Sequence, residues 1–198
     1  CDSRILHIVQ DPNEILRLYV ALSGMKDVGS SLKELRAAIG DIFHNPIKGF
    51  GVLGGYTQRR WSQATGLGAD KIIRELSPKL RKAAAVYEEY VVELARVSDL
   101  LLRKHGKGIA DAQYQQKRVA DIAIDMFVGL CTLSRADALV KAKDPHAAQA
   151  ESIALTFTRQ ARRRMARNVR GVEKNEDEEF DALAGFALER GAYPWDVI

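Results

Sequence analysis

The sequence is poor in cysteine and in long apolar runs. It has two cysteines among 198 residues, Cys1 and Cys131. They lie far apart, and Cys131 stands within an apolar helical pattern, so we predict a free buried thiol there and a reducing compartment. The longest apolar run, Met126–Cys131, is far shorter than the roughly 18–20 residues of a membrane-spanning helix. The first residues do not follow the order of a signal peptide either.

Patterns of metal ligands and catalytic nucleophiles are missing as well. No serine or cysteine stands in a recognisable nucleophile motif, and the histidines lack metal-ligand spacing, so we expect no metal site. The four histidines are His7, His44, His105 and His146. The net charge of +4 favours anionic partners without naming one.

Apolar residues recur every three or four positions along most of the chain, and no segment reads as a strand. This periodicity predicts an all-α protein, an antiparallel bundle of long helices without a sheet. Three helices are predicted to begin at Pro12, at Ser30 or Ser31, and at Ser77-Pro78, the last of them ending at His105. A longer helix is predicted from about Ile109 to Ala142, another begins at Asp144-Pro145, and the last covers roughly Asn175 to Glu189. We expect one helical domain over residues 1–198, in which 44–76 form a glycine-rich connector before the bundle of 77–198.

The inward faces follow from the same spacing. Two flanking residues widen the face of the helix after Ile109, which suggests that it is covered on more than one side. The side chains predicted to face inward are Ile15, Leu18, Tyr19 and Leu22; Leu32, Leu35, Ile39 and Ile42; Leu80, Ala84, Tyr87, Val91, Leu94, Val97 and Leu101; Val119, Ile122, Ala123, Met126, Phe127, Leu130 and Leu133; and Ile153, Phe157, Ala161 and Met165.

One helix carries a basic stripe, flanked by Arg162 and Arg164. Such a stripe suits phosphates of CoA, lipid headgroups or nucleic acid. The alternative is a solvated face balanced by the acidic run that begins at Glu173. Aromatic residues for base stacking are missing around it, so we expect no nucleic-acid partner. The candidate ligand-binding residues are Arg159, Arg163, Arg167 and Arg170.

The connector between residues 44 and 76 allows two interpretations. Its apolar residues from Phe50 to Trp61 stand beside Lys48, Arg59 and Arg60, a composition typical of shallow insertion into a membrane interface. The other interpretation is a loop that folds back over the bundle.

Several segments, in order, resemble the very-long-chain branch of the acyl-CoA dehydrogenases. The most specific is Asp2-Ser3-Arg4-Ile5 followed by Asn13–Leu22. Others are Asn45-Pro46, Arg59-Arg60, Leu101–Gly108, Lys117–Asp121 and Leu133–Ala136. Within this resemblance, residues 1–43 correspond to the last helices of the dehydrogenase core.

The resemblance implies the carboxy-terminal helical region of a homodimeric enzyme. Members of that family oxidise fatty acyl-CoA with FAD and associate with membranes, and one relative serves in respiratory-complex assembly. The implied location is the cytoplasm or the mitochondrial matrix, with peripheral membrane contact. The implied ligands are fatty acyl-CoA or an anionic lipid.

The sequence departs from the family at its catalytic glutamate. Where the family has Glu-Gly-Thr-Asn, this chain has Gln10-Asp11-Pro12-Asn13. A carboxamide takes no proton at useful pH, so Gln10 is not the base. Asp11 is either a helix cap or a relocated base, and Asn13 is the one position left as a cofactor-binding candidate. We therefore expect an acyl-CoA dehydrogenase-like domain, a fragment or a degenerate member, with little activity and no retained flavin alone; the alternative is a docking or assembly module.

Overall fold

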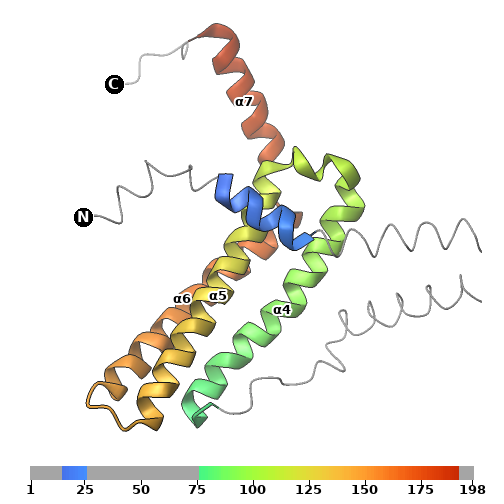
Figure 1. Cartoon of the computed structure of the whole chain (residues 1–198). Helices are drawn as coiled ribbons and strands as arrows, with labels where there is room; N and C mark the ends of the chain where they lie inside the picture. Colours follow the sequence, from blue (N-terminus) through green and yellow to red (C-terminus); the bar gives the residue numbers. More distant parts are fainter. Residues whose placement is uncertain (1–14, 26–75, 192–198) are drawn as a thin grey trace, which may run out of the picture.

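The computed structural model describes residues 15–25 and 76–191, and every regular element in these ranges is helical (Figure 1). After a helix over residues 15–25 come α4, η1, α5, α6 and α7. Their bounds are Pro78–His105 for α4, Gly106–Ala110 for the 3-10 helix η1, Gln113–Lys141 for α5, Ala147–Glu173 for α6 and Asp177–Arg190 for α7. The predicted all-α fold is confirmed.

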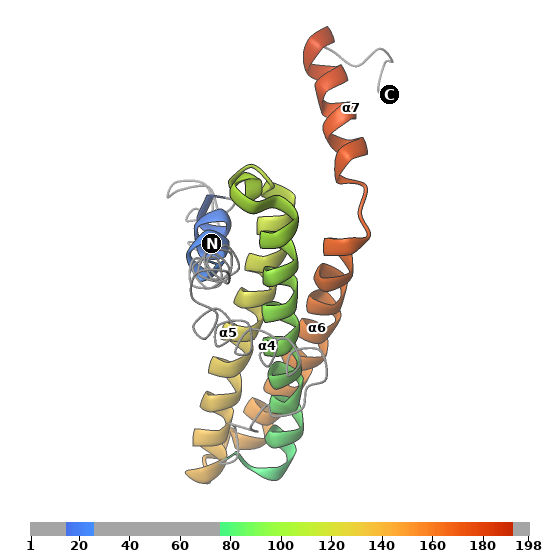
Figure 2. The same cartoon turned by 90° about the vertical axis from the view of Figure 1, so that its right-hand side faces the viewer.

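Three long helices form the body of the molecule. Helices α4, α5 and α6 run side by side, and each is antiparallel to the helix before it (Figure 1). Residues 15–25 lie across the end of the bundle where η1 joins α4 to α5, and α7 projects beyond that same end (Figure 2). No described helix is long and apolar enough to cross a membrane.

Helix α4 begins and ends where the sequence indicates. Pro78 occupies its first turn, and Gly106 follows it with a φ of 56°, a conformation that glycine adopts without strain. Ser77 makes no side-chain cap; instead its backbone N–H donates to Asp137 Oδ1 of α5 at 2.8 Å. The predicted inward face is buried at all but two positions: Leu94 is half-buried, and Val91, at the edge of that face, is exposed.

Helices α4, α5 and α6 meet at Gly129. A Cβ added at Gly129 would overlap the ring of Tyr87, which is fully buried and donates from its hydroxyl to Thr158 Oγ1 at 3.1 Å. Burial raises the pKa of Tyr87, so the hydroxyl stays a proton donor well above neutral pH. The absence of a side chain at Gly129 therefore lets one tyrosine join three helices.

Helix α5 starts later than predicted. Residues Gly106–Ala110 form η1, and α5 begins at Gln113. The buried Gln116 donates from Nε2 to the carbonyl oxygens of Ile109 and Ala110, at 2.6 and 2.8 Å. In a continuous α-helix these two carbonyl oxygens would accept from backbone N–H groups of the next turn, and here the side chain of Gln116 donates to them.

The inward face of α5 is confirmed at its centre but not at its edge. Val119, Ile122, Met126 and Leu133 are buried. The predictions for Phe127 and Cys131 were wrong: Phe127 is 68% exposed, and the free thiol of Cys131 is exposed. Both lie on the side of α5 away from α4 and α6, where the described residues provide no third neighbour.

Helix α6 is buried along one face of small residues. Ala161 and Met165 lie in the core as predicted, together with Ala154 and Thr158. Ile153 was predicted inward but is 58% exposed. Its position is close to a quarter turn from the buried face, at about 100° per residue, so the core does not reach it.

The helix over residues 15–25 is buried on a different face from the one predicted. Ala21 and Met25 are buried against α4 and α5, whereas Ile15, Tyr19 and Leu22 are exposed, Tyr19 at 70%. Apolar residues surround this short helix on nearly all sides, so their spacing does not single out one face.

Candidate anion-binding face and polar hollow

The arginine stripe of α6 lies on the side of the helix opposite its buried face. At about 100° per residue, Arg159, Arg163, Arg167 and Arg170 fall within roughly 80° of one another. The buried residues Ala154, Thr158, Ala161, Met165 and Val172 cluster half a turn away. All four arginines are exposed. The bundle therefore presents them to solvent as one face.

The flanking arginines have structural partners. Arg164 donates from Nε and Nη2 to the carboxylate of Asp125 of α5 at 2.6 to 3.1 Å, and this hydrogen bonding raises the pKa of the guanidinium. Arg162 lies 3.9 Å from Glu89 of α4. Arg164 also covers the ring of Phe157 at 5.4 Å. Arg164 thus joins α6 to α5 and is not free for a ligand.

Among the described residues, the four arginines of the stripe lack a carboxylate partner. Within the described ranges, no acidic side chain pairs with Arg163, Arg167 or Arg170, and Arg159 donates to Thr156 Oγ1 at 2.9 Å. Two members of the acidic run that begins at Glu173 are engaged elsewhere, since Glu173 pairs with Arg96 at 3.0 Å and Asp177 pairs with Arg118 at 2.6 Å. These two carboxylates do not neutralise the stripe.

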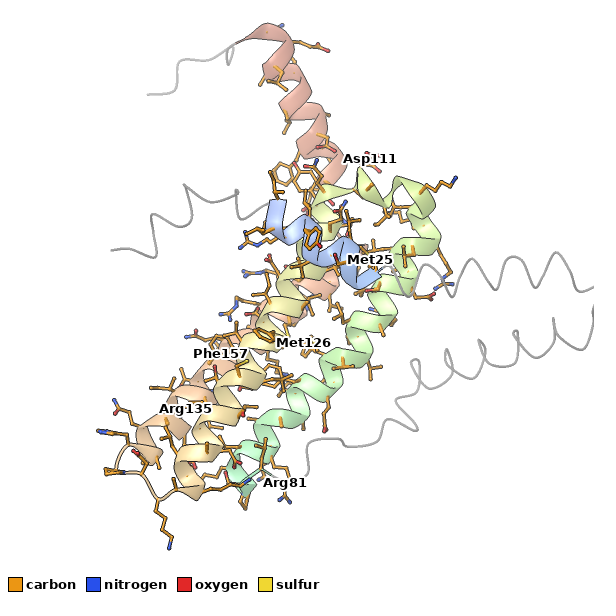
Figure 3. All side chains as sticks on the ribbon, viewed as in Figure 1. Met25, Arg81, Asp111, Met126, Arg135 and Phe157 are labelled. Atoms are coloured by element: carbon orange, nitrogen blue, oxygen red, sulfur yellow. The ribbon has the colours of Figure 1, made fainter. Side chains whose placement is uncertain are left out.

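A second feature is a polar hollow of about 480 Å³ at the end of the bundle. Residues 15–25, the end of α4, the start of α5 and the α6–α7 junction surround it. Asp111, which lines it, lies at this end in Figure 3. Its lining residues are Leu18, Lys104, His105, Asp111, Ala112, Gln113, Tyr114, Gln115, Lys117, Asn175, Asp177, Glu178 and Asp181. No sequence pattern predicts this hollow, because its lining comes from four separate segments.

The lining of the hollow does not fit a flavin dinucleotide. Four carboxylates outnumber two lysines there, and like charge repels the diphosphate of such a cofactor. Buried beside it, Gln115 Oε1 and His105 Nε2 have no hydrogen-bond partner among the described residues, while Gln115 Nε2 donates to Asp177 Oδ2 at 3.2 Å. We derive no flavin chemistry from this hollow.

The remaining predicted site residues lie outside the described ranges. Gln10, Asp11 and Asn13 precede residue 15, and the connector around Phe50–Trp61 falls between 25 and 76. The loss of the base at Gln10, the role of Asp11 as a cap or relocated base, and the cofactor contact of Asn13 therefore stay predictions. The membrane contact of the connector also stays a prediction.

The described chain is thus a three-helix bundle that carries an exposed cationic face and a projecting helix. A family profile described as "ACAD9/ACADV, C-terminal domain" matches residues 78–189, from the start of α4 to the end of α7. The chain belongs to this family. The resemblance predicted from the sequence is confirmed.

Curated relatives extend the match beyond the bundle. The mitochondrial very long-chain specific acyl-CoA dehydrogenase of Rattus norvegicus is 29% identical over 196 residues, which cover 96% of this chain. The human protein of that name is 29% identical over 195 residues, and that of Macaca fascicularis 34% over 152 residues, or 77% of this chain. The chain spans 29% of the length of the rat and human proteins and 23% of the macaque protein for these matches.

Proposed function

We propose that this chain is a non-catalytic helical module of an acyl-CoA dehydrogenase and that the arginine face of α6 binds to the surface of an anionic membrane. The carrying observation is the arginine stripe, Arg159, Arg163, Arg167 and Arg170, exposed opposite the buried face of α6. A row along one straight helix suits the plane of lipid headgroups better than it suits one small ligand.

The electrostatics of the stripe support this function. Arginines that already have carboxylate partners gain little from a phosphate, whereas unpaired guanidiniums form charge-assisted hydrogen bonds with it. Arg163, Arg167 and Arg170 are of the second kind among the described residues. Each cation held near an anionic membrane contributes about 1 kcal/mol. Three or four of them together give useful but salt-sensitive attachment.

Vesicle co-sedimentation tests the proposal. The 198-residue chain is mixed with phosphatidylcholine vesicles that either contain or lack phosphatidylglycerol. We expect binding only to the anionic vesicles, and Arg163→Ala with Arg167→Ala should weaken it by roughly 30-fold, from about 2 kcal/mol lost. The matched control is Lys82→Ala with Lys107→Ala, which removes the same charge from exposed positions on α4 and η1.

Salt separates this surface from a buried acyl-chain site. Raising the ionic strength from about 0.1 M to 1 M shortens the screening length from about 10 Å to 3 Å, so attachment through the stripe should vanish. Calorimetry with a long-chain acyl-CoA provides the second arm. Salt-resistant acyl-CoA binding that is insensitive to the arginine pair would contradict the proposal and favour a pocket between helices.

The family places this module in a larger context. We infer that the whole protein is a flavin-dependent enzyme of fatty acid metabolism that acts on acyl-CoA, as the names of its relatives suggest for the substrate. On the same ground we propose a mitochondrial matrix location with peripheral membrane contact, and a homodimer. None of these properties depends on the 198-residue chain being active.

A protein-docking role is the second candidate. It is favoured by the exposure of large apolar side chains on α5 and α7, among them Phe127 and Leu183. An anionic membrane attracts the stripe but leaves these apolar surfaces uncovered, so the two functions are compatible.

A further inference from the structure

Helix α7 exposes an apolar face that its own bundle does not cover. None of the residues from Asp177 to Arg190 is buried. Leu183 and Leu188 are 64% and 82% exposed, and Phe180 and Phe186 are exposed as well. Helical spacing puts Phe180, Leu183 and Leu188 on one side together with Ala184 and Ala187. An isolated helix of this length is marginal in water, so a partner surface is needed to stabilise it.

The base of α7 is held so that the helix points away from the bundle. Arg118 of α5 donates to both carboxylate oxygens of Asp177, each at 2.6 Å, and Asn175 Oδ1 accepts from the backbone N–H of Asp177 at 3.2 Å. Beyond this anchor α7 extends past the end of α4 and α5 in both views (Figures 1 and 2). Its apolar face therefore does not meet the sides of its own three-helix body.

A matching apolar surface lies on the side of that body. We call it the α5–α6 patch, and its residues are Ile124, Phe127, Val128 and Cys131 of α5 with Ile153 and Phe157 of α6. A shallow depression bounded by Phe127, Leu130, Cys131 and Ala138 runs along it. Phe157 and Arg135 mark this side in Figure 3.

The two surfaces have opposite charge at their edges. At the two edges of its apolar face α7 carries Glu179 and Asp181, against one cation, Arg190. The α5–α6 patch is bordered by Arg135, which also lines the depression and has no carboxylate partner among the described residues. Complementary charge at the rim of an apolar contact favours one partner over others and fixes its orientation.

We propose that α7 docks on the α5–α6 patch of a second copy of this chain, and that the second copy returns the same contact. Such a reciprocal exchange is closed by a two-fold axis. Phe180, Leu183 and Leu188 together bury on the order of 400 Å² of α7, so two symmetric contacts bury roughly 1,600 Å² in total, the size of a stable interface. The inference deepens the homodimer proposed above by naming its contact, and it is independent of lipid attachment.

Cross-linking of two differently marked copies tests the contact. One copy carries Cys131 as its sole thiol after Cys1→Ser, and the other carries Cys1→Ser, Cys131→Ser and Ala184→Cys on the apolar side of α7. A short bismaleimide should join the two copies into a mixed dimer. The matched control replaces Ala184→Cys by Ala182→Cys, which lies about 200° away around the same helix and should cross-link far less.

The result is read together with light scattering. A mixed dimer through Ala184→Cys but not Ala182→Cys, lost when Leu183→Glu is added, supports the proposal. Because α7 buries nothing in its own bundle, Leu183→Glu should leave thermal unfolding of the monomer unchanged. A chain that stays monomeric at micromolar concentration overturns the proposal. A dimer that survives Leu183→Glu overturns the proposal as well and shows that the interface lies elsewhere. Vesicle binding is measured in a separate experiment, so a failure of the dimer contact is distinguishable from a failure of lipid attachment.

Discussion

Replacing Gly129 by alanine should destabilise the bundle although alanine is the better helix former. Gly129 lies inside α5, and its missing side chain makes room for the ring of Tyr87 from α4. A Cβ at this position would overlap ring carbons as well as the hydroxyl, so a small rotation of the tyrosine does not relieve the overlap. Tyr87 is 1% exposed, so its ring is enclosed by the core.

The magnitude follows from three opposing effects. Forcing a methyl group into a filled core costs about 1–3 kcal/mol. Moving the ring also breaks the 3.1 Å hydrogen bond to Thr158, which costs about 1 kcal/mol more. Alanine regains about 1 kcal/mol of helix propensity. We therefore expect Gly129→Ala to lower the free energy of unfolding by about 1–3 kcal/mol.

Urea unfolding followed by far-ultraviolet circular dichroism measures this change. Gly24→Ala is the matched control, because a Cβ there meets no atom within 4 Å and only the helix propensity changes. In a Tyr87→Ala background the overlap is absent, so Gly129→Ala should become neutral or stabilising. If Gly129→Ala proves as harmless as Gly24→Ala in the wild-type background, the argument from close packing at Tyr87 is refuted.

Two further predictions concern acid stability and catalysis. Burial alone would raise the pKa of Asp137, but hydrogen bonds from Lys141 and the backbone N–H of Ser77 outweigh it and hold the pKa below the ordinary 3.8. Its contribution to stability is therefore present above about pH 4 and lost as the pH falls through the folded-state pKa, and Asp137→Asn should flatten that part of the stability profile measured by urea unfolding. With Gln10 in place of the family's glutamate, an electron-acceptor assay on the 198-residue chain should show no flavin-dependent oxidation of fatty acyl-CoA; turnover clearly above background would contradict this.

Helix boundaries were predictable because they depend on local chemistry. Ser77-Pro78 begins α4, Gly106 ends it, and Gly191, with a φ of 68°, ends α7, all as the sequence indicates. In each case the signal is the φ preference of one residue, which acts without a partner from elsewhere in the chain. The α5 start was missed because Gly106–Ala110 remains helical in character but tightens to a 3-10 turn.

The candidate site was predictable only in part. Spacing alone places Arg159, Arg163 and Arg167 on one face, because that inference needs only the helical period. It does not reveal that Arg164 belongs to Asp125, since 39 residues separate them and their meeting depends on the register of α5 against α6. The polar hollow has the same origin, in the packing of segments far apart in the sequence.

The wrong burial predictions share one direction. Tyr19, Phe127 and Ile153 were all predicted inward and are all exposed. The spacing of apolar residues indicates which sides of a helix are apolar. Burial in the described ranges shows which of those sides are already covered by another helix. Where the two disagree, the sequence is suited to a neighbour that the described residues do not include. Phe127 and Ile153 belong to the α5–α6 patch, so this disagreement falls on the surface that we propose as the contact for α7, for which the charge of Arg135 and the projection of α7 are further arguments.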